Sequence, residues 1–134
     1  MYSKDILALD DVKRVVDAAE AEAQKNDWKV VIAVVDDGGH LMYLQREKVQ
    51  LGSIDVAITK AKTALMFRRP TRFWEETVAA GRQGYLALKD MLPIEGGVPL
   101  TYNGQIVGAI GVSGVKSSQD GQIAEAGAKA LSSS

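Results

Sequence analysis

Residues 10–26 show the spacing of a helix that buries one face. Apolar residues recur every three or four positions, and charged residues fill most of the positions between them. The apolar face consists of Val12, Val15, Val16, Ala19 and Ala23. Asp10 is a residue type favoured just before a helix, and Asn26-Asp27 is typical of a helix end. The pattern predicts a helix that packs this face on a core.

A continuous apolar run predicts a buried strand and, with it, a first hairpin. Residues 30–35 contain four Val and one Ile, which is typical of a strand covered on both faces. Asp36-Asp37-Gly38-Gly39 then supplies residues that tolerate positive φ in a tight turn. Residues 40–46 continue as the second strand of this hairpin.

The C-terminal part of the chain predicts a second hairpin and a final helix. Asn103-Gly104, a strong two-residue turn signal, joins a strand over residues 98–102 to a strand over residues 105–113. Ser118 is expected to cap the helix that follows. Residues 132–134, all Ser, are expected to fray.

The middle of the chain predicts helices, the first of which has two apolar sides. It begins near Ser53 and ends before Arg69-Pro70, because the residue before Pro avoids the helical region. The side that a helix resting on one sheet would leave polar carries Val56, Thr63, Met66 and Phe67. Either another layer within the chain or an interface between subunits explains this side. Two shorter helices follow, over residues 71–80 and 83–91.

The predicted order of elements is α-β-β-α-α-α-β-β-α. Both hairpins are antiparallel and the helices between them are grouped, which indicates an α+β fold with a sheet of about four or five strands covered by helices. The 134 residues form one domain, because a second core would need roughly another hundred residues. We expect its ordered core over residues 10–131.

Composition narrows the class of function. A net charge of −1 and a pI of 5.8 argue against a dedicated nucleic-acid binder. The absence of Cys excludes disulfides, thiolate metal sites and Cys nucleophiles. No apolar run approaches the ~18 residues that span a bilayer, and residues 1–5 do not resemble a secretory signal. We therefore expect a cytoplasmic protein with neither a membrane nor a nucleic acid as partner.

A glycine-rich segment late in the chain invites a dinucleotide-binding interpretation that its spacing does not support. Gly108, Gly111 and Gly114 form G-x-x-G-x-x-G, and too few residues follow to complete the binding unit. Ser113 lacks the following Gly of a nucleophile elbow. We expect Gly108 and Gly111 to let another backbone or a ligand approach the strand closely.

His40 is the single His of the chain, so it is the one imidazole available as a base or a haem ligand. Just after the turn, a neutral imidazole can ligate iron or exchange protons near neutral pH. The alternative is an ordinary hairpin residue. Asp36 and Asp37 are able to bind a cation, but turn chemistry already accounts for both.

The charges of the chain are unevenly distributed near its middle. Between Asp55 and Glu75 there is no acidic residue, whereas elsewhere the two signs alternate. The basic residues of this stretch are Lys60, Lys62, Arg68, Arg69 and Arg72. A run of one sign usually forms a solvated face, and Lys62 fits that explanation.

Lys60 differs from the other basic residues because it lies on the second apolar side of its helix, near Phe67. Its stem can lie in apolar contact while its ammonium group meets a carboxylate. The backbone N–H groups of Gly96-Gly97 can approach the same ligand closely. These features predict a pocket for a small anionic ligand, with Arg68 as a further cation.

Five blocks of sequence in a fixed order resemble the GlcG/HbpS-like family. They are residues 34–41, 53–64, 69–71, 96–100, and 107–114 with 119–120. Members are small proteins, some labelled haem-degrading, related to the C-terminal domain of PduO-type proteins. The resemblance implies a profilin-like or PAS-like antiparallel sheet, and assembly as dimers or larger homo-oligomers.

The resemblance also implies a ligand and a set of site residues. Some members associate with haem or a corrinoid, and some haem-binding relatives use a His of the N-terminal helix, which this sequence lacks. His40, Tyr43 or Met42 would have to replace it. The positions that match the family blocks and are expected near a pocket are Asp36, His40, Ser53, Lys60, Gly96, Gly97 and Gly111.

Three functions are compatible with these residues. The first is a homo-oligomeric binding protein for haem, another tetrapyrrole or a small carboxylate, with Lys60 and Arg68 neutralising the ligand and His40 as candidate axial ligand. The second is a cofactor-free isomerase or tautomerase of small organic acids, in which Lys60 holds the carboxylate and His40 moves the proton, so that the two must be close. The third is a structural or signalling accessory protein.

Overall fold

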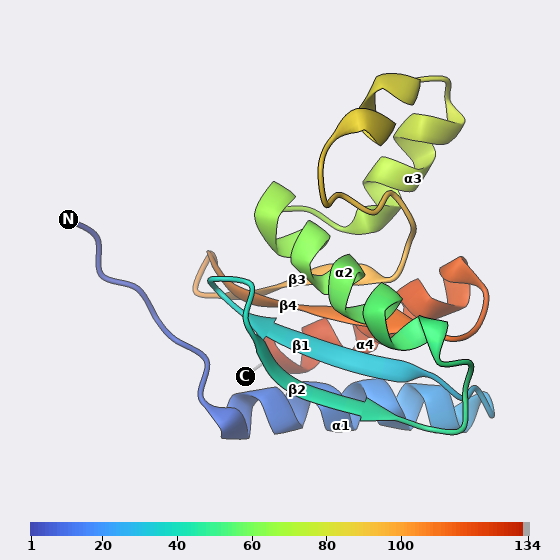
Figure 1. The fold of residues 1–134 in the computed structure, drawn as a ribbon. Coiled ribbons are helices and arrows are strands. Elements are labelled where there is room, and N and C mark those ends of the chain that lie inside the picture. Colours follow the sequence, from blue (N-terminus) through green and yellow to red (C-terminus); the bar gives the residue numbers. More distant parts are fainter. Residues whose placement is uncertain (133–134) are drawn as a thin grey trace.

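A computed structural model describes residues 1–132 as a four-stranded sheet with helices on both faces (Figure 1). The elements are α1 (Leu9–Lys25), β1 (Val31–Asp36), β2 (Leu41–Arg46), α2 (Gly52–Phe67), α3 (Thr71–Ala79), the 3-10 helix η1 (Gln83–Ala87), β3 (Gly97–Tyr102), β4 (Gln105–Ser113) and α4 (Ser117–Ser132). The predicted α+β class is confirmed. Ser132 ends α4, and the rest of the predicted frayed tail lies outside the described residues.

Both predicted hairpins form, and they pair with each other through their inner strands. The sheet order is β2-β1-β4-β3, and all three pairings are antiparallel. The second hairpin turns at Asn103 and Gly104, whose φ values of 50° and 75° are both left-handed. Two central residues with positive φ match the right-handed twist of the flanking strands, which is why this dipeptide predicts a hairpin so well.

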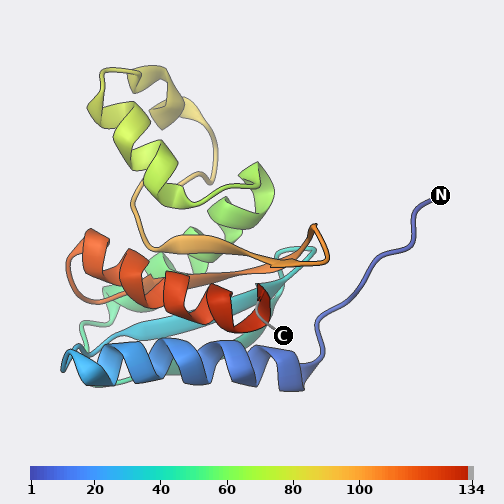
Figure 2. The same cartoon turned by 180° about the vertical axis from the view of Figure 1, so that it is seen from behind.

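Two layers of helix enclose the sheet. Helices α1 and α4 lie side by side on one face, and α2 crosses the other (Figures 1 and 2). The larger core, which includes Val15, Ile32 and Ile110, lies under α1 and α4. Helix α2 presents small residues such as Ala57 and Ala61 to the sheet, so its backbone comes very close to β4.

The second apolar side of α2, which faces away from the sheet, is covered in part by another layer of the same chain. Helix α3 and η1 form a lobe that stands above the C-terminal end of α2 (Figure 1). The ring of Trp74 in this lobe meets Phe67 edge-on at 5.4 Å, and the Leu92 amide donates to Thr63 Oγ1 at 3.0 Å. The lobe therefore provides a second layer over Thr63 and Phe67, whereas Met66 stays 60% exposed.

Helix ends and one helix differ from the predictions. The helix expected over residues 83–91 is only the five-residue η1, because Gly84 weakens a helix there and the short turn already packs Tyr85 on Trp74 at 4.8 Å. The residue expected to cap the first helix, Asp10, lies within the first turn of α1. Within residues 1–132, none of the helices has the length and apolar character needed to cross a membrane.

Gly111 of β4 is where α2 touches the sheet, which predicts that it cannot be replaced. A Cβ atom at this position would collide with the carbonyl oxygen of Ala57 and would lie 2.6 Å from the amide nitrogen of Ala61. Gly111→Ala should lower the free energy of unfolding by about 1–3 kcal/mol, because a backbone has to move. Gly52→Ala is the control, since nothing lies within 4 Å of its added Cβ. Urea denaturation that finds both variants equally stable would contradict this contact.

Candidate functional site

Lys60 of α2 points into the protein, and its charge already has a partner there. Its side chain is 2% exposed, and its ammonium group donates to the carbonyl oxygen of Val112 and to Asp120 Oδ2, both at 3.0 Å. The inward direction agrees with the sequence-based expectation. The anion that meets the ammonium group is a carboxylate of this same chain.

Asp120 is held as firmly as Lys60. It lies in the first turn of α4, where a negative charge is favourable, and its second oxygen accepts the Val115 amide at 3.1 Å. Burial raises the pKa of Asp120 from 3.8 to about 6, although the positive charge of Lys60 and two hydrogen bonds act against that rise. Sequence reasoning missed this residue because the two partners are 60 positions apart.

The glycines expected to bind a ligand lie against Lys60, and both also line a second cavity together with Arg72. A Cβ at Gly96 would lie 2.8 Å from Lys60 Nζ, and a Cβ at Gly97 would collide with the Lys60 carbonyl group. The Gly97 amide donates to Thr71 Oγ1 at 2.9 Å, and the Gly96 carbonyl accepts the Val112 amide at 2.9 Å. Their missing side chains make room for the lysine and for the backbone around it.

The remaining predicted site residues belong to other parts of the fold. Asp36 Oδ1 accepts the amides of Gly38 and His40, both at 2.9 Å, and these bonds lower the pKa of Asp36. Ser53 is buried at the start of α2 and accepts a hydrogen bond from Gln50 at 3.2 Å. Arg68 lies exposed at the left-handed end of α2, with a φ of 60°.

His40 does not share a site with Lys60. Its side chain is 83% exposed on the β1–β2 turn, where Nδ1 lies 3.4 Å from Asp36 Oδ1. Neither His40 nor Lys60 lines any of the three cavities described for residues 1–132. Within one chain, none of these three cavities brings the two side chains to a common substrate, which the isomerase hypothesis needs.

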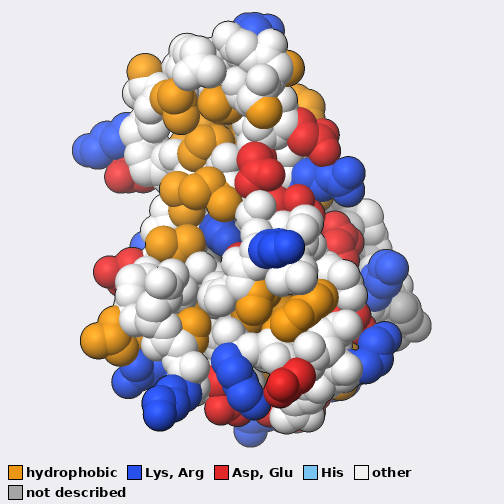
Figure 3. All heavy atoms as spheres, turned by 90° about the vertical axis from the view of Figure 1, so that its right-hand side faces the viewer, with side chains coloured by type: hydrophobic (Ala, Val, Ile, Leu, Met, Phe, Trp, Pro, Cys, Tyr) orange, Lys and Arg blue, Asp and Glu red, His pale blue; other side chains and the backbone are white. Residues whose placement is uncertain are grey.

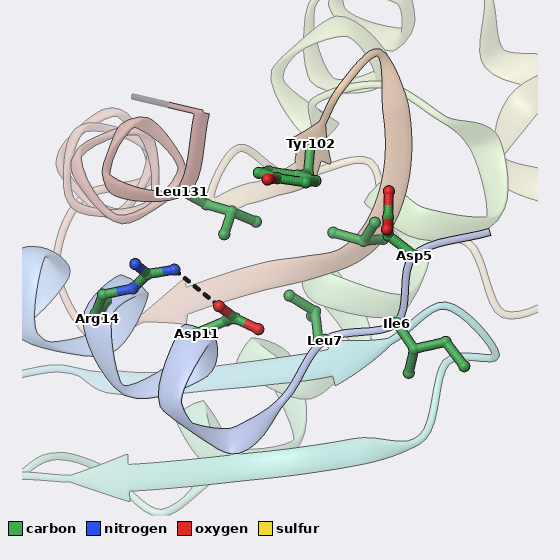
Figure 4. Close-up of a pocket in the computed structure, with 8 residues that line it drawn as sticks. Asp5, Ile6, Leu7, Asp11, Arg14, Tyr102 and Leu131 are labelled. Carbon is green, nitrogen blue, oxygen red and sulfur yellow. Dashed lines mark hydrogen bonds and ion pairs between the residues drawn. The ribbon is translucent and has the colours of Figure 1, made fainter. Parts of the chain in front are cut away.

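A cavity of about 370 Å³ lies at the start of α1, where the sequence had suggested no site (Figure 4). We call it the N-terminal cavity. It is lined by Asp5, Ile6, Leu7, Asp11, Arg14, Tyr102, Val107 and Leu131. These residues come from the segment before α1, from α1 itself, from the second hairpin and from the end of α4. No local pattern could have indicated it, because four separate segments build it.

The N-terminal cavity combines an apolar floor with one cation, Arg14, and two carboxylates, those of Asp5 and Asp11. Leu7, Val107 and Leu131 are buried beneath it. Arg14 Nη2 donates to Asp11 Oδ1 at 2.8 Å, and no other residue in the described part of the chain accepts a hydrogen bond from this guanidinium group. Because a guanidinium group has five N–H donors, Arg14 retains donors for a ligand carboxylate. Asp5 lies at the other end of the cavity (Figure 4).

The described residues do not fit haem well. An iron porphyrin in a protein usually takes an axial ligand from His, Met, Cys or Tyr. No His or Met lines the three cavities found in residues 1–132, and Met42 packs against the core. Tyr102, at the rim of the N-terminal cavity, is the only side chain of these four types in any of them. Within one chain, His40 therefore has no haem pocket beside it.

The raised pKa of Asp120 predicts a measurable pH dependence of stability. A carboxyl whose pKa is 3.8 when unfolded and about 6 when folded adds stability that is complete below pH 3.8 and lost as the pH rises through about 6. Wild type should therefore lose stability relative to Asp120→Asn over this window, by on the order of 2 kcal/mol. Chemical denaturation at a series of pH values measures the difference. A difference that stays flat would contradict the assignment.

Comparison with known proteins gives consistent matches over the whole fold. A family model described as "Haem degrading protein HbpS-like" matches residues 7–129. Protein GlcG of Escherichia coli (strain K12) is 42% identical over 114 residues, which cover 84% of this chain and 85% of GlcG. The crystal structure of HbpS has a TM-score of 0.88 and 30% identity, covering 98% of this chain and 94% of HbpS. A PduOC:heme complex has a TM-score of 0.83 and 27% identity, covering 95% and 96% of the two chains. The resemblance found in the sequence is confirmed, and the chain belongs to the HbpS-like family.

Proposed function

We propose that this protein is a homo-oligomeric binding protein for a small organic acid, with the N-terminal cavity as its site. The observation that carries the proposal is the pairing, in one cavity of about 370 Å³, of an apolar floor with a guanidinium group that bonds only Asp11 among the residues that the structure describes. This volume lies within the range of small-molecule sites, which are mostly apolar with a few polar groups that orient the ligand.

Charges at the two ends of the cavity favour a ligand with one carboxylate. Arg14 offers a planar pair of N–H groups at one end, which suits a carboxylate. Asp5 at the other end repels a second carboxylate, because two like charges at close range destabilise a complex. The apolar body of the ligand then lies over Leu7, Val107 and Leu131, with the ring of Tyr102 beside it.

The proposal places the ligand at Arg14 and not at Lys60, because the two cations differ in how accessible their N–H donors are to a ligand. A ligand carboxylate at Lys60 would have to displace Asp120 from a buried ion pair, and that would leave Asp120 without its partner. At Arg14 the bond to Asp11 uses one N–H group, so a ligand carboxylate can bond the other N–H groups without displacing Asp11, although it then lies near the charge of Asp11. A relative was crystallised with haem, so haem is one of the compounds to be compared.

Exposed apolar side chains support the homo-oligomeric part of the proposal. Figure 3 shows hydrophobic side chains gathered on the lobe and where the lobe meets the body. Met66 at the end of α2 is 60% exposed, Phe73 in α3 is 43% exposed and Leu86 in η1 is 55% exposed. Exposed large apolar side chains are typical of surfaces that another copy covers.

Thermal-shift measurements with matched ligands test the proposed function. Benzoate should raise the melting temperature in a concentration-dependent way, whereas phthalate, with a second carboxylate, and benzamide, with none, should raise it less. Arg14→Gln should weaken benzoate binding by about ten- to a hundredfold, since one charge-assisted contact is worth about 1.5–3 kcal/mol. Lys13→Gln, at an exposed position of the same helix, is the control.

The outcomes separate the parts of the proposal. Stabilisation by benzoate that is equal in wild type and Arg14→Gln would contradict the site. Stabilisation by haem alone, with a Soret shift, would contradict the ligand class. Light scattering on the same samples should give a multiple of 14.4 kDa, and a monomer would contradict the homo-oligomer.

A further inference from the structure

The two outer strands of the sheet differ in how well their outer edges are protected. Strands β2 and β3 stand at opposite margins of the sheet order β2-β1-β4-β3 (Figure 1). The outer edge of such a strand presents unpaired N–H and C=O groups, which readily bond a strand of another chain. Opposite residues of an antiparallel pair are alternately bonded and non-bonded, so the hydrogen bonds to the inner neighbour show which backbone groups face outward.

The outer edge of β3 is closed by its own sequence and by α3. Because the Gly96 carbonyl accepts the Val112 amide, the alternation turns the backbone groups of Gly97 and Pro99 outward. The Gly97 amide donates to Thr71 Oγ1 at 2.9 Å, and the Thr71 hydroxyl lies 3.4 Å from the Gly97 carbonyl oxygen. Pro99 has no N–H group to offer. A further strand would find few groups to bond at this edge.

The outer edge of β2 has no such protection within residues 1–132. The Glu47 amide donates to the carbonyl group of Val30, just before β1, at 3.2 Å. The alternation therefore turns the N–H and C=O groups of Arg46 and Leu44 outward. Residues 41–45 contain neither Pro nor a charged side chain, and no other strand of the described chain pairs with this edge. Strand β2 thus offers a further strand a row of donors and acceptors.

Apolar side chains beside β2 favour covering this edge. Helix α2 packs across β1, β3 and β4, which leaves the same side of β2 at the rim of the layer. Leu44 and Ile58 pack on the small core at this rim and are half-buried. Leu41 is 49% exposed, and Met66, which is 60% exposed, reaches the β1–β2 turn, where a Cβ at Gly39 would lie 3.1 Å from it. Covering these side chains would remove apolar surface from water.

The charges at the two ends of β2 indicate that the covering strand is β2 of a second copy. Asp36 and Asp37, with Lys4 as the one cation bound there, leave the turn before β2 negative. Residues 46–48, Arg-Glu-Lys, leave the other end positive. Two antiparallel copies of β2 place the negative end of each beside the positive end of the other, whereas parallel copies would place like charges together. A two-fold axis produces this arrangement from one surface.

We propose that the outer edge of β2 is an interface with a second copy of this chain, in which the two β2 strands pair antiparallel and join the two sheets into one. This inference rests on the homo-oligomeric part of the proposed function and names a surface for it. The two-fold axis passes beside Leu44, whose outward N–H and C=O groups bond those of the same residue in the second copy. Pairing closes the edge that a single chain leaves open.

Hydrogen exchange resolved to single amides tests this interface without a substitution. In the oligomer, the Leu44 amide should be protected like the Gln45 amide, which faces β1 in the same strand. On dilution to the monomer, exchange of the Leu44 amide should become at least about tenfold faster, because its hydrogen bond is lost with the second copy. Exchange of the Gln45 amide should not rise with it, because its bond lies within one chain.

Charge reversal at the end of β2 tests the antiparallel arrangement. Arg46→Glu places a negative charge beside the acidic turn of the second copy and should weaken self-association by about tenfold. Lys129→Glu is the matched control, because it reverses a charge on α4 beside Pro99 of the other outer strand. Light scattering over a series of protein concentrations measures both variants against wild type.

The results distinguish this interface from the homo-oligomer in general. A wild type that stays monomeric at every concentration overturns both this inference and the homo-oligomeric part of the proposed function. An oligomer in which the Leu44 amide exchanges much faster than the Gln45 amide overturns the β2 interface and leaves a homo-oligomer built on another surface. Equal self-association of Arg46→Glu and Lys129→Glu overturns the antiparallel pairing of the two strands.

Discussion

The buried ion pair between Lys60 and Asp120 is the constraint on which the centre of this structure depends. It joins α2 to the first turn of α4 and to the end of β4, through the carbonyl group of Val112. A lysine ammonium group that is 2% exposed would be very costly without a partner. The segment at residues 96–97 has to be glycine because the lysine and its backbone occupy the space that side chains would need.

Lys60 and Arg14 have different roles. The charge of Lys60 is used inside the fold by its pair with Asp120, whereas the charge of Arg14 is accessible to a ligand. Lys60 is desolvated and bonded to both Asp120 and Val112, so it fixes the positions of α2, α4 and β4 relative to one another. Arg14 is half exposed, bonds Asp11 through one of its donors, and stands beside an apolar cavity. Membership of the HbpS-like family does not contradict a ligand at Arg14, because a shared fold does not by itself determine which ligand each member binds.

The secondary structure was predictable because its signals are local. The apolar run before Asp36 and the Asn103-Gly104 turn each determine their own neighbourhood, and β4 begins and ends where the sequence indicated. The segment after Gly81 was less predictable, because contacts with Trp74 decide its short 3-10 helix. Helix starts differed by one to a few residues, since a cap depends on the local path of the chain.

The candidate site was predictable only in part, because pairing across the fold leaves no local pattern. The inward direction of Lys60 followed from its place on an apolar side of a helix, whereas its partner Asp120 did not. His40 and Asp36 stood out in the sequence, yet their strongest contacts are those of a turn. The N-terminal cavity needed the tertiary structure, because Leu7 and Leu131 meet from opposite ends of the chain.

A double-mutant cycle on the free energy of unfolding tests the central claim most directly. Lys60→Met and Asp120→Leu should each cost about 3–5 kcal/mol, because each leaves one buried charge without its partner. The double variant, in which both charges are replaced by apolar side chains, should lose far less than the sum of the two. Additive losses in urea denaturation would show that the two residues do not act as a pair, and would contradict the account.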